Sequence, residues 1–472
     1  MFSFSKNYFL FYFSFIVLII FLSVKWISTR LKTKKNLPPS PPKLPIIGNL
    51  HQLGLSPYRS LRALSRKHGP LMLMHFGSVP VLVASSPEAA KEIMKTHDLK
   101  FCNRPKLRIV DIVVYGSNDI TFSPYGEYWR QVKSIAVVHL LNTTRVQSFR
   151  KTREEEVGLM IDMIEKSSGS VVDLSELLFR LVNNIVCKAA LGRTYPGSKF
   201  ADLLERFVWV LGAVSLGSYI PWLSWIKEEG MDVDAQSGED QDLVDILLDV
   251  KGDNTTGFTF HRNTVKALIL DVFAAGTDTT FTSLVWSISE LLRHPRVMEK
   301  LKQEVTKIAQ GRSMILEKDL ENMQYLKAVI KETLRMYPPI PLLIPHESTE
   351  DVKLLGYDIP AGTQTLVNAW AIGRDSTAWE EPEEFKPERF LNSSTNYKGL
   401  HFELLPFGGG RRGCPGIPFA TVIFELALAN VIYKFDLALP NGVKNTDLDM
   451  REKFGITLHK EAHLLIMATP SF

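Results

Sequence analysis

Cysteine is scarce in this chain: its 472 residues include only Cys102, Cys187 and Cys414. A disulfide-dense secreted scaffold is therefore excluded, because such domains depend on many paired cysteines. Internal repeats and low-complexity stretches are also absent. With 45% hydrophobic and 22% charged residues, the composition is that of a packed globular protein. It excludes disorder, collagen or a coiled coil as the main architecture.

Acidic residues are missing from residues 1–36, where six basic residues stand. The whole chain carries a formal charge of +4, so the remainder has 49 basic against 51 acidic residues and a net charge of −2. The basic balance therefore belongs to the N-terminus, and we expect no nucleic-acid partner for the body. The six basic residues are Lys6, Lys25, Arg30, Lys32, Lys34 and Lys35.

An uncharged apolar run over residues 7–24 predicts one membrane-spanning helix, since roughly 20 apolar residues cross the hydrocarbon core. A cleaved signal peptide is the alternative, but a basic cluster follows the run instead of a small-residue cleavage site. We therefore predict a membrane anchor with its basic flank over residues 1–36, with the body facing the cytosol. The prolines of residues 37–49 predict an extended hinge, with an adaptor-domain ligand as the alternative. The body follows over residues 50–472.

The body is predicted to be mostly α-helical with a small β region. A long apolar helix is expected over residues 261–293, ended by His294-Pro295. Strands are expected at Leu71–Phe76, at Pro80–Ala84 and as a pair over residues 452–469. No regular βαβ alternation occurs, which disfavours a doubly wound sheet. Further helices are predicted at residues 56–68, 87–97, 150–166, 173–190, 199–216, 295–310 and 318–336, and from the end of a Gly-rich loop at 407–416 to about 434.

The Gly-rich loop over residues 407–416 is the sharpest local motif. Its Gly408-x-Gly410-x-x-Gly413 spacing matches a dinucleotide fingerprint, but that motif requires a preceding strand in a βαβ unit. The favoured interpretation uses Cys414: glycines turn backbone N–H groups toward the sulfur, and the following helix N-terminus stabilises a thiolate. Such a thiolate suits a haem iron. Cys102 and Cys187 are interpreted instead as small buried hydrophobic residues.

The pattern Phe-x-x-Gly-x-Arg-x-Cys-x-Gly over residues 407–416 resembles the haem-binding signature of cytochrome P450 monooxygenases. The resemblance implies that Cys414 is the proximal ligand of a haem b iron. It also implies that Phe407 lies against the sulfur and that Arg412 pairs with a haem propionate. The cofactor-binding residues assigned in this loop are Phe407, Gly408, Arg412, Cys414 and Gly416.

The second motif lies inside the long apolar helix, where Gly276 and its threonine neighbours are poor helix formers. Threonine hydroxyls that bond back to carbonyls can loosen the helix and leave a groove for proton delivery. A plain Gly/Thr helix contact in the core is the alternative. The segment matches the oxygen-activation motif of the family. By that match Thr279 hydrogen-bonds iron-bound dioxygen, Asp278 relays protons, and Ala275 and Gly276 leave room above the iron.

Glu332 and Arg335 share one helix face, which a plain surface ion pair would also explain. The family joins these two residues to an arginine in the Pro-rich meander, here Arg389. The resemblance therefore implies a buried structural lock behind the haem, which survives only if every charge is paired.

Trp129 and Lys133, four residues apart on one helix face, match a propionate site of the family. Lys133 keeps the charge that many relatives carry on arginine but lacks its bidentate fork. His346 stands where arginine is common, so a neutral ring there would bind propionate more weakly. Family position also suggests a set of substrate-pocket residues, and plain core packing would explain them equally well. They are Ile112, Val113, Phe273, Ala274, Leu342, Leu343, Phe454 and Ile456.

The resemblance extends over the whole chain and is closest to plant microsomal A-type members. It implies insertion of one oxygen atom from dioxygen into a lipophilic small molecule such as a terpenoid, alkaloid or phenolic. Electrons would come from NADPH through a separate NADPH–cytochrome P450 reductase docked near Cys414, at the endoplasmic reticulum membrane. The alternatives are a haem-thiolate isomerase or dehydratase that needs no reductase, and a non-catalytic haem or ligand-binding protein.

One departure from the family concerns the roof of the substrate pocket. Relatives continue with a long helix after the segment matched by residues 221–225. Here only residues 226–241 lead to the next matching segment, and they read as an acidic loop. We therefore expect a shortened roof over an intact haem site.

Overall fold

The computed structural model describes residues 35–194, 198–212, 262–453 and 455–471, together with Ile16, Ile20 and Tyr219. Most of the predicted anchor, the shortened segment 226–241 and Phe454 lie outside these residues.

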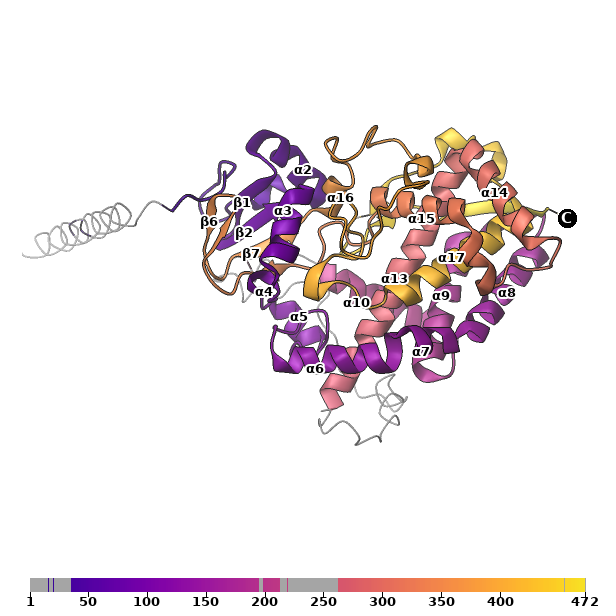
Figure 1. Cartoon of the computed structure of the whole chain (residues 1–472), viewed down its shortest axis with the longest axis horizontal. Coiled ribbons are helices and arrows are strands. Elements are labelled where there is room, and N and C mark those ends of the chain that lie inside the picture. The colour runs from indigo at the N-terminus through magenta and orange to yellow at the C-terminus, as the bar shows by residue number, and fades with distance from the viewer. Residues whose placement is uncertain are drawn as a thin grey trace, which may run out of the picture.

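Helices form the larger part of the described chain, and α13 (Arg262–Arg293) crosses their centre (Figure 1). It packs against α9 (Leu174–Leu191) and α17 (Ile417–Lys434). The helix ends at Arg293 because Pro295 restricts the backbone of His294, and the proline then takes the first position of α14 (Pro295–Ala309). This arrangement puts the predicted oxygen-activation motif in the middle of the body.

Two helices of the described chain, Asn263–Arg293 and Ile417–Lys434, are long and apolar enough to cross a membrane by length and composition. Their most apolar windows are 50% and 61% buried inside the protein, respectively. Trp286 of α13 and Leu428 of α17 are fully buried in the main hydrophobic cluster. Core packing therefore accounts for the apolar character of both helices.

A four-stranded sheet lies toward one end of the molecule with the strand order β1-β2-β7-β4 (Figure 1). Strands β1 (Leu71–Phe76) and β2 (Val79–Ala84) form a hairpin in which Leu71 pairs with Ala84. Strand β7 (Gln364–Val367) then runs parallel to β2, although almost 300 residues separate them in the chain. Segments that precede and follow the main helices in the sequence thus pair in one sheet.

The C-terminal residues close the fold against α13. Strand β11 (Leu465–Pro470) pairs with β3 (Val171–Asp173) and β8 (Phe435–Ala438). Before it, the carbonyl oxygen of Leu458 accepts hydrogen bonds from Thr282 Oγ1 at 2.9 Å and Trp286 Nε1 at 2.8 Å. These bonds hold the preceding turn on the face of α13 next to the predicted motif.

The remaining predicted elements show two differences. The strand pair predicted over residues 452–469 is a short pair, Glu452–Lys453 with His459–Lys460, followed by β11 in a separate sheet. The helix predicted over residues 318–336 is two helices, because the non-helical backbone of Met323 separates a short turn at Glu317–Asn322 from α15. The other α-helices are α2 (Pro57–His68), α3 (Pro87–Lys91), α4 (Asp98–Phe101), α5 (Arg108–Val113), α6 (Glu127–Ala136), α7 (Thr143–Ser148), α8 (Arg150–Lys166), α10 (Ser198–Gly212), α15 (Gln324–Met336) and α16 (Ala369–Ile372). The other strands are β4 (His346–Glu347), β5 (Val352–Leu354), β6 (Tyr357–Ile359), β9 (Glu452–Lys453) and β10 (His459–Lys460).

Candidate active site

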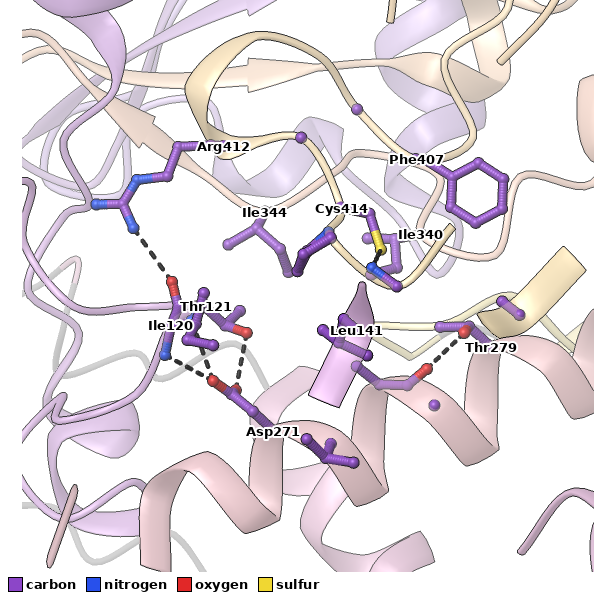
Figure 2. A pocket seen from close by; sticks show the side chains of 18 of the residues that line it. Ile120, Thr121, Leu141, Asp271, Thr279, Ile340, Ile344, Phe407, Arg412 and Cys414 are labelled. Carbon is purple, nitrogen blue, oxygen red and sulfur yellow. Dashed lines mark hydrogen bonds between the residues drawn. The ribbon is translucent and has the colours of Figure 1, made fainter. Parts of the chain in front are cut away.

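A cavity of about 260 Å³ lies between α13 and the loop that carries Cys414 (Figure 2). One face of α13 forms its floor, because residues four apart on a helix project in the same direction. Figure 2 shows Cys414 and Thr279 on opposite sides of this space. The α13 residues that line the cavity are Asp271, Val272, Ala275, Gly276 and Thr279.

The Cys414 loop is held in one conformation by its glycines. Gly410 has a φ of +63°, and a Cβ there would come within 2.3 Å of the Met94 carbonyl oxygen. The N–H of Cys414 donates to the Phe407 carbonyl at 3.0 Å, and the N–H of Gly416 approaches the Cys414 sulfur at 3.4 Å. The sulfur is therefore presented to the cavity with one backbone donor pointing at it.

The chemistry of this sulfur suits a metal ligand. Cys414 is accessible, but only toward the cavity that it lines. Burial raises the pKa of its thiol, while the Gly416 N–H and the charge of Lys133 act in the opposite direction. A metal cation at the sulfur would supply the missing stabilisation of the thiolate.

A set of cationic and aromatic side chains surrounds the other side of the cavity. The Arg412 guanidinium stacks 4.2 Å from the Trp129 ring centroid, and Lys133 Nζ lies 5.0 Å from it. Lys133 Nζ also donates to the carbonyl oxygen of Arg411 at 2.6 Å. His346 lines the same cavity, and its Nδ1 lies 2.9 Å from the Phe101 carbonyl oxygen. We call Arg104, Trp129, Lys133, His346 and Arg412 the cationic cradle.

The electrostatics of the cationic cradle favour an anionic ligand. Burial and then the charge of Arg412 lower the pKa of Arg104 to about 9, and burial lowers that of Arg412 to about 10. Burial followed by the nearby arginines lowers the pKa of His346 to about 3, so this ring is neutral. Carboxylates strongly stabilise the charged forms of cations that are buried close to one another. A group with an iron centre and two propionates therefore fits the sulfur and the cationic cradle together.

Thr279 and Asp278 point in different directions. Thr279 lines the cavity and its hydroxyl donates to the Ala275 carbonyl at 2.6 Å, while α13 continues unbroken. Asp278 is buried away from the cavity, where Thr457 Oγ1 donates to it at 2.6 Å and His459 Nε2 lies at 3.2 Å. Any proton route through Asp278 therefore runs from the C-terminal turn to the helix.

Gly276 combines the two functions that the sequence offered as alternatives, space in the cavity and a close helix contact. It lines the cavity, but a Cβ at this position would come within 3.3 Å of Val186 Cγ2 on α9. The missing side chain thus permits the close approach of α9 and α13 as well as leaving space in the cavity.

Glu332, Arg335 and Arg389 meet in a buried cluster. Arg335 forms two hydrogen bonds to the Glu332 carboxylate, at 2.7 Å and 2.8 Å, and Arg389 Nε donates to the same carboxylate at 3.0 Å. The Glu332 and Arg335 side chains are fully buried. Arg335 also donates to backbone carbonyls of the Pro-rich meander, residues 374–400, including that of Pro382 at 2.7 Å. The cluster therefore joins α15 to the meander.

The predicted substrate-pocket residues divide into three groups. Leu342, Leu343 and Ile456 line an apolar cavity of about 150 Å³ that shares residues with the main one. Ile112 is 63% exposed, and Phe273 is buried in the main core. Both lie outside the lining of the two cavities, because α5 turns Ile112 to the surface and α13 turns Phe273 away from the cavity by about 100° per residue. Val113 and Ala274 pack against core clusters, outside the lining of either cavity.

Two cavity residues carry no recognisable sequence signal. Arg104 is buried and donates to the carbonyl oxygens of Thr121 at 2.9 Å and Pro345 at 2.8 Å. Asp271 projects from α13 toward the loop before α6 (Figure 2). In the sequence each is a charged residue beside apolar ones, which does not distinguish a buried residue from a surface residue. Only the tertiary contacts show that both belong to the cavity.

Comparison with known proteins identifies the family. A family model described as Cytochrome P450 matches residues 38–225 and 222–467. The chain belongs to the cytochrome P450 family. Members of this family are monooxygenases that carry a haem iron with a cysteine thiolate ligand, and this P450 has the cysteine and the cationic cradle that such a group requires.

The similar proteins include several plant P450s. Cytochrome P450 Tp4149 of Tanacetum parthenium is 56% identical over 479 residues, which covers 96% of each chain. A 3-beta-hydroxylase of the same species is 52% identical over 499 residues and 100% of each chain. Norfluorocurarine oxidase of a Strychnos species is 50% identical over 491 residues, again covering 96% of each chain.

The same fold occurs in a solved structure. A zebra fish cytochrome P450 with abiraterone aligns with a TM-score of 0.72 and 28% identity, over 88% of this chain and 99% of that one. The alignment with the 3-beta-hydroxylase is 27 positions longer than this P450. The family match divides at residues 222–225, directly before the segment that the sequence predicts to be short.

Proposed function

We propose that this P450 inserts one oxygen atom from dioxygen into a lipophilic small molecule of plant specialised metabolism. The observation that carries the proposal is the placement of the Cys414 sulfur across one largely apolar cavity from Thr279. The haem, when bound by Cys414 and the cationic cradle, supplies dioxygen activation with a thiolate that favours O–O cleavage. Relatives named as a hydroxylase and an oxidase support the same reaction class.

The protein side chains around the cavity have separate tasks in this proposal. The Thr279 hydroxyl is a donor and acceptor on the cavity wall, suited to passing a proton to a reacting oxygen. Asp278, held by Thr457 and His459 behind it, relays protons toward that hydroxyl. The apolar lining excludes water and selects a lipophilic substrate. Leu342, Leu343 and Ile456 line the adjoining cavity and contact that substrate.

The proposal extends to partners and location. Residues 1–36 anchor the chain in the endoplasmic reticulum membrane, residues 37–49 form a hinge, and residues 50–472 are the haem domain in the cytosol. An NADPH–cytochrome P450 reductase delivers electrons at the face near Cys414, where the exposed Arg130 and Arg411 offer positive charge. Relatives have a helix over the substrate pocket where this P450 has residues 226–241, so the shortening should change which substrates are accepted and leave the haem ligands unchanged.

The decisive experiment is turnover in microsomes with and without the reductase. We expect oxygenated product from a panel of terpenoids, alkaloids and phenolics only when NADPH and the reductase are both present. Product formed from a peroxide substrate without NADPH would instead indicate an isomerase or dehydratase. A reduced protein that binds carbon monoxide but turns over nothing in the panel would favour a haem protein without monooxygenase activity.

Thr279→Ala should separate electron use from product formation. The variant removes the hydroxyl that lines the cavity but leaves Cys414 and the cationic cradle in place. We expect NADPH oxidation to continue while product per NADPH falls on the order of a hundredfold, the lower range of general acid–base effects. Thr279→Ser, which keeps the hydroxyl, is the control and should stay close to the wild type. Equal coupling in Thr279→Ala and the wild type would contradict the proton-transfer function.

A further inference from the structure

The loop before α6 is tied to α13 by one carboxylate. Asp271 Oδ2 accepts the N–H of Ile120 at 2.6 Å and that of Thr121 at 3.3 Å, and its Oδ1 accepts the Thr121 hydroxyl at 2.8 Å. Figure 2 shows Asp271 rising from α13 to both residues. Three donors on two consecutive residues make this contact specific, because charge-assisted hydrogen bonds are the strong ones.

The opposite side of the same loop holds the cationic cradle. The carbonyl oxygen of Ile120 accepts Trp129 Nε1 at 2.9 Å and Arg412 Nη1 at 3.2 Å. The carbonyl oxygen of Thr121 accepts Arg104 Nε at 2.9 Å. The Ile120 carbonyl and the Thr121 N–H belong to one rigid peptide plane, so the position that Asp271 imposes on this N–H is passed on to Trp129 and Arg412. The Thr121 carbonyl, which holds Arg104, belongs to the next plane, whose Phe122 N–H donates to Asp119.

A second acid, Asp119, lies beside Asp271 and is fully buried. Its Oδ2 accepts the Phe122 N–H at 3.0 Å. Within the described part of the chain, Oδ1 has no N–H or O–H donor, although the side chain is within hydrogen-bonding reach of Asp271. Two carboxylates can share a hydrogen bond only if one of them is protonated, and two bare charges buried together would repel strongly.

We propose that the Asp119–Asp271 carboxyl pair, through one shared proton, positions the cationic cradle by holding Ile120 and Thr121 against α13. The two aspartates are positioning residues, since they act on the haem through the loop. The inference rests on the proposed function, because the cationic cradle matters only if it holds a haem.

The surrounding charges determine the pH at which the pair loses its proton. Burial and then the charge of Asp271 raise the pKa of Asp119 to about 8, and burial raises that of Asp271 to about 6. Arg104 opposes the rise at Asp119, and Arg412 and Tyr128 are the other charged or titratable groups that face it. The pair therefore keeps one proton at neutral pH.

The sign of the pH effect follows from the raised pKa of Asp119. A carboxyl whose pKa is higher in the folded than in the unfolded protein gives a stabilisation that is complete below its ordinary pKa of 3.8 and is lost as the pH rises through about 8. Above that value both carboxylates are charged and push the loop away from α13. The cationic cradle should then hold haem less firmly.

The test measures haem release from the holoenzyme to excess apomyoglobin between pH 6.5 and 9.5. The wild type should release haem faster above about pH 8, where the pair loses its proton. Asp119→Asn donates to Asp271 through its amide and needs no shared proton, so it should lack the step near pH 8. Asp271→Ala removes the carboxylate that holds Ile120 and Thr121. Its haem release at pH 7 should be on the order of ten- to a hundredfold faster, the loss typical when a group that supports a metal ligand is removed.

Two further variants keep the test decisive. Asp271→Asn keeps an acceptor for the loop, so it covers the case in which Asp271→Ala does not fold, and it should also lack the step near pH 8. Asp111→Asn removes a carboxylate that accepts the nearby Ser117 hydroxyl outside the pair, and it should retain the wild-type pH profile. If the haem-release rate of the wild type shows no step with pH, or if Asp119→Asn shows the same step, the inference is overturned and the proposed function still stands. A wild type without the thiolate band in the presence of carbon monoxide would overturn the proposed function as well.

Discussion

Cys414→Ser is expected to abolish the red-shifted band that the reduced protein gives with carbon monoxide. The band reports a thiolate bound to the haem iron, and serine offers a harder oxygen with a much higher pKa. Because Cys414 is the cysteine that lines the cavity, no other thiol of the chain can replace it. Product formation should fall to the background of the assay for the same reason.

The measurement is the carbon monoxide difference spectrum of purified holoprotein, with haem content determined separately. Cys187→Ala is the matched control: Cys187 is buried in the core on α9, away from the cavity lining. It should lose some stability through a small void while keeping the band. A red-shifted band in Cys414→Ser would contradict the assignment of the ligand. Loss of the band in both variants would indicate a general folding defect.

The parts of the site that local spacing determines could be predicted from the sequence. The Cys414 loop places its sulfur by backbone turns within ten residues, and Ala275, Gly276 and Thr279 reach the cavity because they share a helix face. The long helix and its end at Arg293 follow from apolar periodicity and Pro295. These features depend on interactions between residues that are close in the sequence, so the order of the residues is enough to predict them.

The parts that depend on tertiary contacts could not be predicted. Asp119, Asp271 and Arg104 act through backbone groups of a loop whose position is set by α13 and the Cys414 loop. Nothing in their spacing distinguishes them from surface charges. Ile112 and Phe273 lie outside the lining of both cavities for a related reason: proximity in sequence to a cavity residue does not fix which face of a helix a side chain occupies.

Glu332→Gln is expected to destabilise the whole protein more than any active-site substitution. It leaves the guanidinium groups of Arg335 and Arg389 without their shared carboxylate, in a cluster where the Arg335 side chain is fully buried. Removing one partner of a buried ion pair typically costs about 3–5 kcal/mol. That is a large fraction of the roughly 5–15 kcal/mol by which proteins of this kind are stable, so we expect low yields of holoprotein.

The expected loss is measured by urea unfolding of the holoenzyme, followed through both the haem absorbance and the far-ultraviolet circular dichroism. Glu155→Gln removes a partner from the exposed Lys151–Glu155 pair, which is separated by 3.7 Å, and should leave the unfolding midpoint within experimental error. The fraction of Glu332→Gln that folds should still show the thiolate band, because the lock lies outside the cavity lining. An unfolding midpoint equal to the wild type would mean that the buried arginines find other partners. A stable variant without the band would instead place Glu332 in haem binding.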